Sequence, residues 1–126
     1  MGDADRIELR GLRLTGVVGV LAEERQRAQP LEVDLGIEVD LSAAGLSDDL
    51  ADTVDYGAVC DAVAAVVAAG EPLLLERLAT QVADAVLALD GRVEAVEVAI
   101  RKTRPPVPHD LGTSGVRLVR QRRSVR

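Results

Sequence analysis

The clearest pattern along the chain is the alternation of apolar and polar residues over positions 31–41, LEVDLGIEVDL. Its apolar residues are Leu31, Val33, Leu35, Ile37, Val39 and Leu41. Every residue between them is charged or glycine. A period of two over eleven residues predicts a long β-strand with one face in water. Because only one face is buried, the strand favours an antiparallel sheet.

Three other segments show a similar alternation. In residues 6–15 the apolar positions change from odd to even numbers at Gly11, which predicts a β-bulge that keeps the apolar side chains on one face. Residues 92–102 and 114–122 return to strand periodicity later in the chain. The sequence therefore predicts four strands.

A helical period separates the two pairs of strands. The first helix is predicted from about Thr53, with Thr53 or Asp55 as its N-cap and Gly70 at its end. The second is predicted from about Pro72 to Leu89. The stretches LAEERQRAQ and SAAGLSDDLADT are predicted to be polar loops. The predicted order β-β-α-α-β-β indicates an α+β fold, in which two helices cover the apolar face of a four-stranded antiparallel sheet.

Composition limits the classes of function. The chain has 126 residues, which predicts a single domain over positions 1–126. A net charge of −6 argues against a nucleic-acid partner. The exception is the Arg-rich end from position 116 onward, VRLVRQRRSVR, which is interpreted as a solvated, frayed terminus. Cys60 is the one cysteine, so no internal disulfide is expected and a cytoplasmic location is favoured. No signal peptide or membrane span is predicted.

Two side chains are candidates for chemistry on their positions alone. Glu76 lies in LLLERLA, the segment that follows Pro72. A carboxylate at this place either stabilises the start of a helix or requires a partner. Lys102 is even-numbered, like the apolar residues Val96, Val98 and Ile100 of its predicted strand. Its side chain is therefore expected to lie on the same face, toward the helices, unless the strand frays. A desolvated lysine can move protons near neutral pH.

Other reactive side chains are sparse. Tyr56 is the one aromatic residue, and it is expected either to pack in the core or to reach a neighbouring chain. His109 is the one imidazole, which argues against a metal site. The Asp residues at 48, 49 and 52 lack the spacing of an EF-hand. Because the sequence also contains no nucleophile elbow and no dinucleotide or phosphate fingerprint, no bound cofactor is expected.

Five segments together resemble the dihydroneopterin aldolases of folate biosynthesis, a bacterial family of tunnelling-fold enzymes. These segments are GVVGVLAEER, PLEVDLGIEVDL, SDDLADTVDYGAV, LLLERLA and IRKTRPPVP. The resemblance implies the same antiparallel sheet with two helices. It also implies subunits joined edge to edge in a tetrameric ring, with two rings stacked into a homo-octamer.

The resemblance also implies a site. The family's pterin-binding glutamate falls on Glu76, and Leu75 supplies a backbone contact. The catalytic lysine falls on Lys102 and the catalytic tyrosine on Tyr56. The loop glutamate that holds the hydroxylated side chain of the substrate falls on Glu24.

The family's site residues at Thr53, Val54 and Tyr56 come from a neighbouring subunit. The reaction implied is that of an aldehyde-lyase without metal or cofactor, with epimerisation at the side-chain 2′ carbon as a side reaction. One position departs from many members, which carry His where this chain has Val18.

Two alternatives stay open, the first of which follows from the departure at Val18. The first is an epimerase of dihydroneopterin triphosphate, for which Arg25 and Arg27 supply positive charge in the loop. The second is a non-catalytic pterin- or purine-binding module that keeps Glu76.

Overall fold

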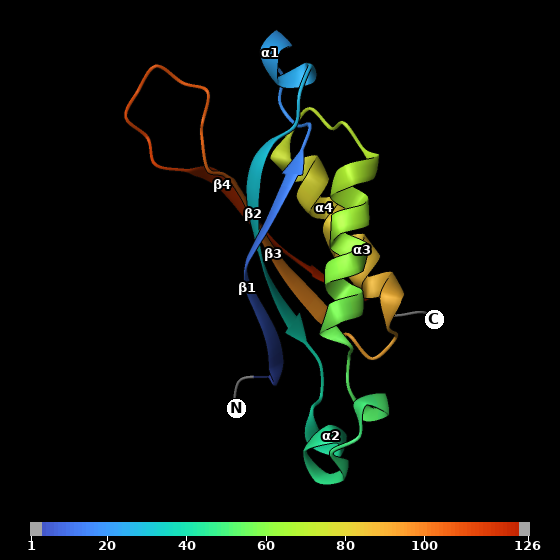
Figure 1. Ribbon diagram of the computed structural model, residues 1–126. Helices are drawn as coiled ribbons and strands as arrows, with labels where there is room; N and C mark the ends of the chain where they lie inside the picture. Colours follow the sequence, from blue (N-terminus) through green and yellow to red (C-terminus); the bar gives the residue numbers. More distant parts are fainter. Residues whose placement is uncertain (1–3, 124–126) are drawn as a thin grey trace.

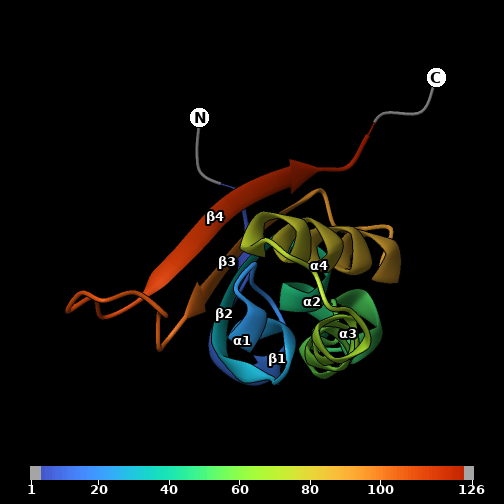
Figure 2. The same ribbon diagram turned by 90° about the horizontal axis from the view of Figure 1, so that it is seen from above.

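The sheet and two long helices form the body of the protein. The computed structural model describes residues 4–123. The strands are β1 Arg6–Gly16, β2 Gln29–Glu38, β3 Ala95–Lys102 and β4 Ser114–Gln121. They form one antiparallel sheet in the order β1-β2-β3-β4. Helices α3, Tyr56–Ala69, and α4, Leu75–Leu89, lie side by side on one face of this curved sheet (Figures 1 and 2). The predicted α+β architecture is confirmed.

The core lies between the sheet and the two helices. The odd-numbered apolar residues of β2 are buried, whereas Glu32 and Asp34 lie on the opposite face. There, the Arg101 side chain of β3 contacts Glu32 at 2.6 Å and Asp34 at 3.0 Å. The alternation therefore separates an aliphatic core from a charged outer face.

The predicted bulge in β1 is present. Leu9 pairs with Leu35, and Leu12 pairs with Val33, so two residues of β1 oppose one residue of β2. Gly11 has a φ of 74°, which costs little only for glycine. Its N–H donates to the Asp34 carboxylate at 2.7 Å.

The helix starts follow local capping chemistry. Asp55 is the N-cap of α3, and its carboxylate accepts hydrogen bonds from the N–H groups of Gly57 and Ala58. Helix α4 starts at Leu75, later than the predicted Pro72, and buries one apolar stripe against the sheet. Among residues 4–123, none of the helices combines the length and apolar character that a membrane crossing requires.

The predicted order β-β-α-α-β-β was incomplete. Helix α1, Ala22–Arg25, lies between β1 and β2, and helix α2, Ser42–Ser47, follows β2 with a 3₁₀ turn, η1, at Leu50–Asp52. These turns form where loops were predicted, because local hydrogen bonds cap them. In η1, the Asp49 carboxylate accepts a hydrogen bond from the Ala51 N–H.

The interpretation of the Arg-rich end as frayed was wrong for its first residues. Arg117 lies in β4 and pairs with Glu97 at 3.0 Å. Arg122 donates to the carbonyls of Leu87, Asp90 and Val93. These carbonyls lie where α4 ends and the chain continues toward β3, and they hold the Arg122 side chain in place. Residues 124–126 lie outside the described part of the chain.

Candidate active site

Four of the expected site residues, Glu24, Leu75, Glu76 and Lys102, meet in one cavity. The cavity has a volume of about 340 Å³ and lies at the end of the molecule that is uppermost in Figure 1, where α1, the start of α4 and the end of β3 come together. Its lining residues are Gly19, Val20, Glu24, Leu73, Leu74, Leu75, Glu76, Lys102, Ser114, Gly115 and Val116.

Lys102 reaches this cavity from the last position of β3. It pairs with Leu31 of β2 and Ser114 of β4, so the pleat points its side chain toward the helices, as its parity predicts. The side chain is 15 % exposed, and its Nζ lies 2.8 Å from Oε2 of Glu24. Lys102 is also the one lysine in the chain, which has arginine at every other cationic position.

Glu24 is a buried carboxylate held by three donors. Lys102 Nζ donates to Oε2 at 2.8 Å, Gln29 Nε2 donates to the same oxygen at 2.9 Å, and the Leu21 N–H donates to Oε1 at 3.3 Å. Burial alone would raise the pKa of Glu24, but these hydrogen bonds and the charge of Lys102 lower the pKa below its ordinary value. Glu24 therefore stays ionised at neutral pH and acts as a hydrogen-bond acceptor.

Gly19 creates the space that the Glu24 carboxylate occupies. A Cβ built on Gly19 would overlap the carboxyl group of Glu24, and the φ of Gly19 is 136°. Any other residue at position 19 would therefore displace the carboxylate as well as strain the backbone.

Glu76 forms the other end of the cavity. It is exposed in the first turn of α4, while Leu75 beside it is buried. In the described part of the chain, no cationic side chain forms an ion pair with Glu76. Its carboxylate therefore reaches solvent and is free to accept hydrogen bonds from a ligand.

Tyr56, Thr53 and Val54 lie elsewhere in the same chain. Helix α3 begins with Tyr56 at the opposite end of the molecule from the cavity (Figure 1). Tyr56 is 64 % exposed, whereas Val54 is buried. A single chain therefore does not bring these residues to Lys102.

Two residues hold the site together in ways that the sequence did not reveal: Gln29 was missed, and Arg25 was expected only to supply charge. Gln29 links the Glu24 carboxylate to the Val18 carbonyl, at 2.9 and 2.7 Å. Arg25 donates to three backbone carbonyls in the loops that enclose the cavity. Neither residue belongs to a periodic pattern. The one compositional signal near this place is the single lysine, Lys102, and it indicates neither of these two residues.

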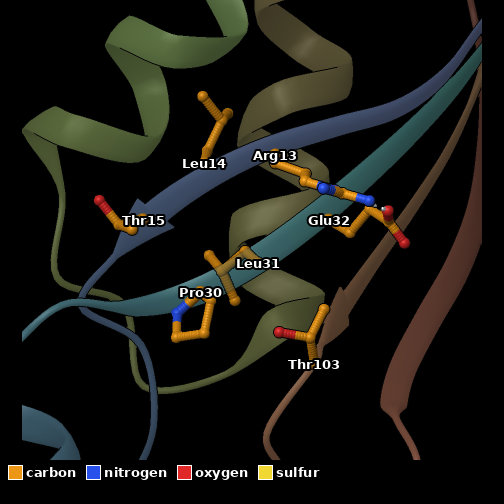
Figure 3. Close-up of a pocket in the computed structure, with 7 residues that line it drawn as sticks. All are labelled: Arg13, Leu14, Thr15, Pro30, Leu31, Glu32 and Thr103. Atoms are coloured by element: carbon orange, nitrogen blue, oxygen red, sulfur yellow. Dashed lines mark ion pairs between the residues drawn. The ribbon is translucent and has the colours of Figure 1, made fainter.

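A second, larger cavity has fewer groups suited to catalysis. It measures about 640 Å³ and is formed by β1, β2 and Thr103 (Figure 3). The one ion pair between two of its lining residues joins Arg13 to Glu32 at 3.7 Å, and the Arg13 side chain is 88 % exposed. Because a solvated pair of this kind is neither desolvated nor strongly oriented, the smaller cavity is the candidate site. Among the described residues, no group of three or more His, Cys, Asp and Glu side chains is placed to hold a metal ion.

Comparison with known proteins places the chain among enzymes of one kind. The family model described as Dihydroneopterin aldolase matches residues 7–119. The dihydroneopterin aldolase of Streptococcus pyogenes serotype M3 is 42 % identical over 118 residues, covering 94 % of this chain and 99 % of the relative.

Solved structures agree with the sequence match. Escherichia coli dihydroneopterin aldolase in complex with neopterin has a TM-score of 0.84 and 28 % identity, covering 92 % of this chain and 98 % of that one. The Burkholderia thailendensis dihydroneopterin aldolase bound to guanine has a TM-score of 0.79 and 29 % identity, covering 96 % and 93 %. With the family model matched over nearly the whole chain, this protein belongs to the dihydroneopterin aldolase family.

Proposed function

We propose that this chain is a cytoplasmic dihydroneopterin aldolase that cleaves 7,8-dihydroneopterin into 6-hydroxymethyl-7,8-dihydropterin and glycolaldehyde. The observation that carries the proposal is the Lys102–Glu24 ion pair of 2.8 Å, which lines the same cavity as the unpaired carboxylate of Glu76. One end of the cavity thus offers an acceptor for a heterocycle, and the other offers groups that hold hydroxyls and move protons.

Glu76 would anchor the pterin ring. The 2-amino-4-oxopyrimidine edge presents adjacent N–H donors, which a carboxylate accepts in bidentate fashion. Neopterin and guanine share this edge, and they are the ligands bound to the two related enzymes. The backbone of Leu75 adds a contact, and Glu24 accepts hydrogen bonds from the side-chain hydroxyls.

The cleavage needs a proton relay and an electron sink. Loss of the proton from the 2′-hydroxyl lets the C1′–C2′ bond break, its electron pair enters the conjugated pterin ring, and glycolaldehyde leaves. Lys102 moves the protons through water, and Tyr56 assists the protonation of the enol that remains. An arginine cannot replace Lys102 here, because a guanidinium does not release its proton in proteins.

A second copy of the chain would complete the site in the proposed tunnelling-fold ring. Val20, Leu73 and Leu74 at the cavity are exposed apolar residues, and Tyr56 is exposed at the far end of α3. Within the described sheet, β1 and β4 each pair on one side only. Joining β1 of one copy to β4 of the next would cover these edges and would bring Thr53, Val54 and Tyr56 to a neighbouring cavity. Two such rings would form the octamer.

The triphosphate epimerase has less support. The Arg25 guanidinium, which was to supply positive charge for a phosphate, donates to the carbonyls of Gly19, Glu71 and Pro72 instead. Val18 stands where many relatives have histidine. It is fully buried and does not line the cavity. Epimerisation at the 2′ carbon is expected only as a side reaction.

The test is turnover of 7,8-dihydroneopterin by the purified protein, with glycolaldehyde and the pterin product measured separately. Lys102→Ala and Lys102→Arg should both lower kcat by about 10²–10⁴-fold, the range for losing a positioned proton-transfer group. Lys102→Arg keeps a cation beside Glu24, so its melting temperature should stay close to that of the wild type. Pterin binding without glycolaldehyde would indicate a binding module, and release of an epimer alone would indicate the epimerase. Unchanged turnover in Lys102→Arg would contradict the assigned role of Lys102.

A further inference from the structure

Arg25 connects the two loops that enclose the cavity. Its Nη1 donates to the carbonyl of Gly19 at 3.0 Å and to that of Pro72 at 2.9 Å, and its Nη2 donates to the carbonyl of Glu71 at 2.6 Å. Gly19 lies between β1 and α1, whereas Glu71 and Pro72 lie between α3 and α4. The Gly19 N–H also donates to Pro72 at 3.3 Å. One guanidinium therefore binds two segments that are far apart in sequence.

The two ends of the cavity are supported very differently. Glu76 lies on the 15-residue helix α4, which is fixed in the core by buried residues such as Leu75 and Leu78. Glu24 lies on α1, which has four residues, and Glu24 is the one buried residue among them. Packing thus fixes Glu76, while the place of α1 depends on a few polar contacts.

We propose that Arg25 is a positioning residue that sets the distance between Glu24 and Glu76, and thereby favours ligands that reach both ends of the cavity. This inference rests on the proposed function, in which Glu76 binds the ring and Glu24 binds the hydroxylated side chain. Arg25 is not among the residues that line the cavity, and it acts through the α1 segment that carries Glu24.

The geometry requires a guanidinium. Three carbonyls accept hydrogen bonds from two nitrogens of one planar group, and the fork holds these donors in fixed directions. A lysine ammonium offers a single nitrogen, so it satisfies part of this set. Arg25→Lys should therefore fall between the wild type and Arg25→Ala.

The experiment compares two ligands by equilibrium titration. Neopterin carries the ring edge and the hydroxylated side chain, whereas guanine carries the ring edge alone. Arg25→Ala should weaken neopterin binding by about tenfold or more, the effect of losing hydrogen bonds from one charged group. Guanine binding should change by less than about threefold, because α4 holds Glu76 without Arg25. Arg27→Ala is the matched control: Arg27 is exposed two residues further on, and among residues 4–123 it forms no ion pair, so both affinities should stay unchanged.

Each outcome decides a separate question. Equal weakening of neopterin and guanine, or no weakening of either, would overturn the positioning role of Arg25. If Arg25→Ala does not fold, the same comparison with Arg25→Lys decides, and a loss confined to neopterin supports the inference. A wild-type protein that binds neither ligand would instead overturn the proposed function.

Discussion

At the scale of single residues, the chemistry of the site depends on how the Glu24 carboxylate is held. Lys102, Gln29 and the Leu21 N–H all donate to it, and Gly19 leaves the room it needs. A carboxylate with this many donors is ordered before a ligand arrives. The substrate side chain would therefore meet a fixed acceptor, which lowers the entropy lost on binding.

The lowered pKa of Glu24 predicts an acid-sensitive contribution to stability. In the unfolded chain the carboxyl titrates near 4.5, and in the folded protein its pKa is lower. The stabilisation is therefore complete above about pH 4.5 and is lost as the pH falls through the folded pKa. Glu24→Gln should lower the free energy of unfolding by about 2 kcal/mol at pH 7, and the gap to the wild type should narrow by pH 3.

Urea unfolding at the two pH values measures this gap. Glu23→Gln is the control, because Glu23 is the exposed neighbour of Glu24 in α1. A gap between wild type and Glu24→Gln that stays constant with pH would show that the ionised form of Glu24 has no special stabilisation.

At the scale of secondary-structure elements, Gly11 sets the register of β1 against β2. Without the bulge, the apolar residues after position 11 would point to the outer face. Gly11→Ala should cost about 1–2 kcal/mol of stability, because its φ of 74° is unfavourable for residues with a Cβ. Gly11→Asn should cost less, since asparagine visits this region more readily. Thermal or urea unfolding of the two variants checks the order, and equal costs would contradict the backbone explanation.

The sheet and the long helices could be predicted because burial imposes a period on them. Alternation revealed the strands and the bulge at Gly11, and the helical period revealed α3 and α4. Helices α1 and α2 escaped prediction because single hydrogen bonds stabilise them, such as that between Glu24 and Leu21. The ordered position of Arg122 was missed for the same reason, since backbone carbonyls hold it.

The site was predictable only in part. Position alone made Glu76 a candidate and placed Lys102 on the helix-facing side of its strand, whereas Glu24 came only from the resemblance to the family. The contact between Lys102 and Glu24 joins residues 78 positions apart, and no local pattern reports such a contact. Arg25 was interpreted as a source of charge for a ligand, whereas its partners are carbonyls that any sequence possesses.

At the scale of the whole molecule, the proposed catalytic groups are divided between the two ends of one chain. Lys102 and Glu24 lie at one end, and Tyr56 lies at the other, where α3 begins. Turnover by the proposed mechanism therefore requires a second copy, and activity should depend on assembly.

Mixing two inactive variants tests this division. Lys102→Ala and Tyr56→Phe should each be nearly inactive alone. When the two are unfolded together and refolded as a mixture, some sites combine an intact Lys102 from one copy with an intact Tyr56 from the next, so turnover should reappear. The same variants refolded apart and then combined are the control. A mixture as inactive as its components would show that the two residues do not serve a shared site.

The contact between Lys102 and Glu24 also constrains how this chain can change over generations. Loss of either partner leaves the other as a nearly buried, uncompensated charge, at a cost of up to about 3 kcal/mol. In a lineage no longer selected for catalysis, the first substitution, at either Lys102 or Glu24, would therefore lower the stability of the fold. The second substitution, at the other residue, would restore part of that stability. The two positions are expected to be inherited together or lost together, so that this ion pair preserves the machinery of the site even where selection on turnover is weak.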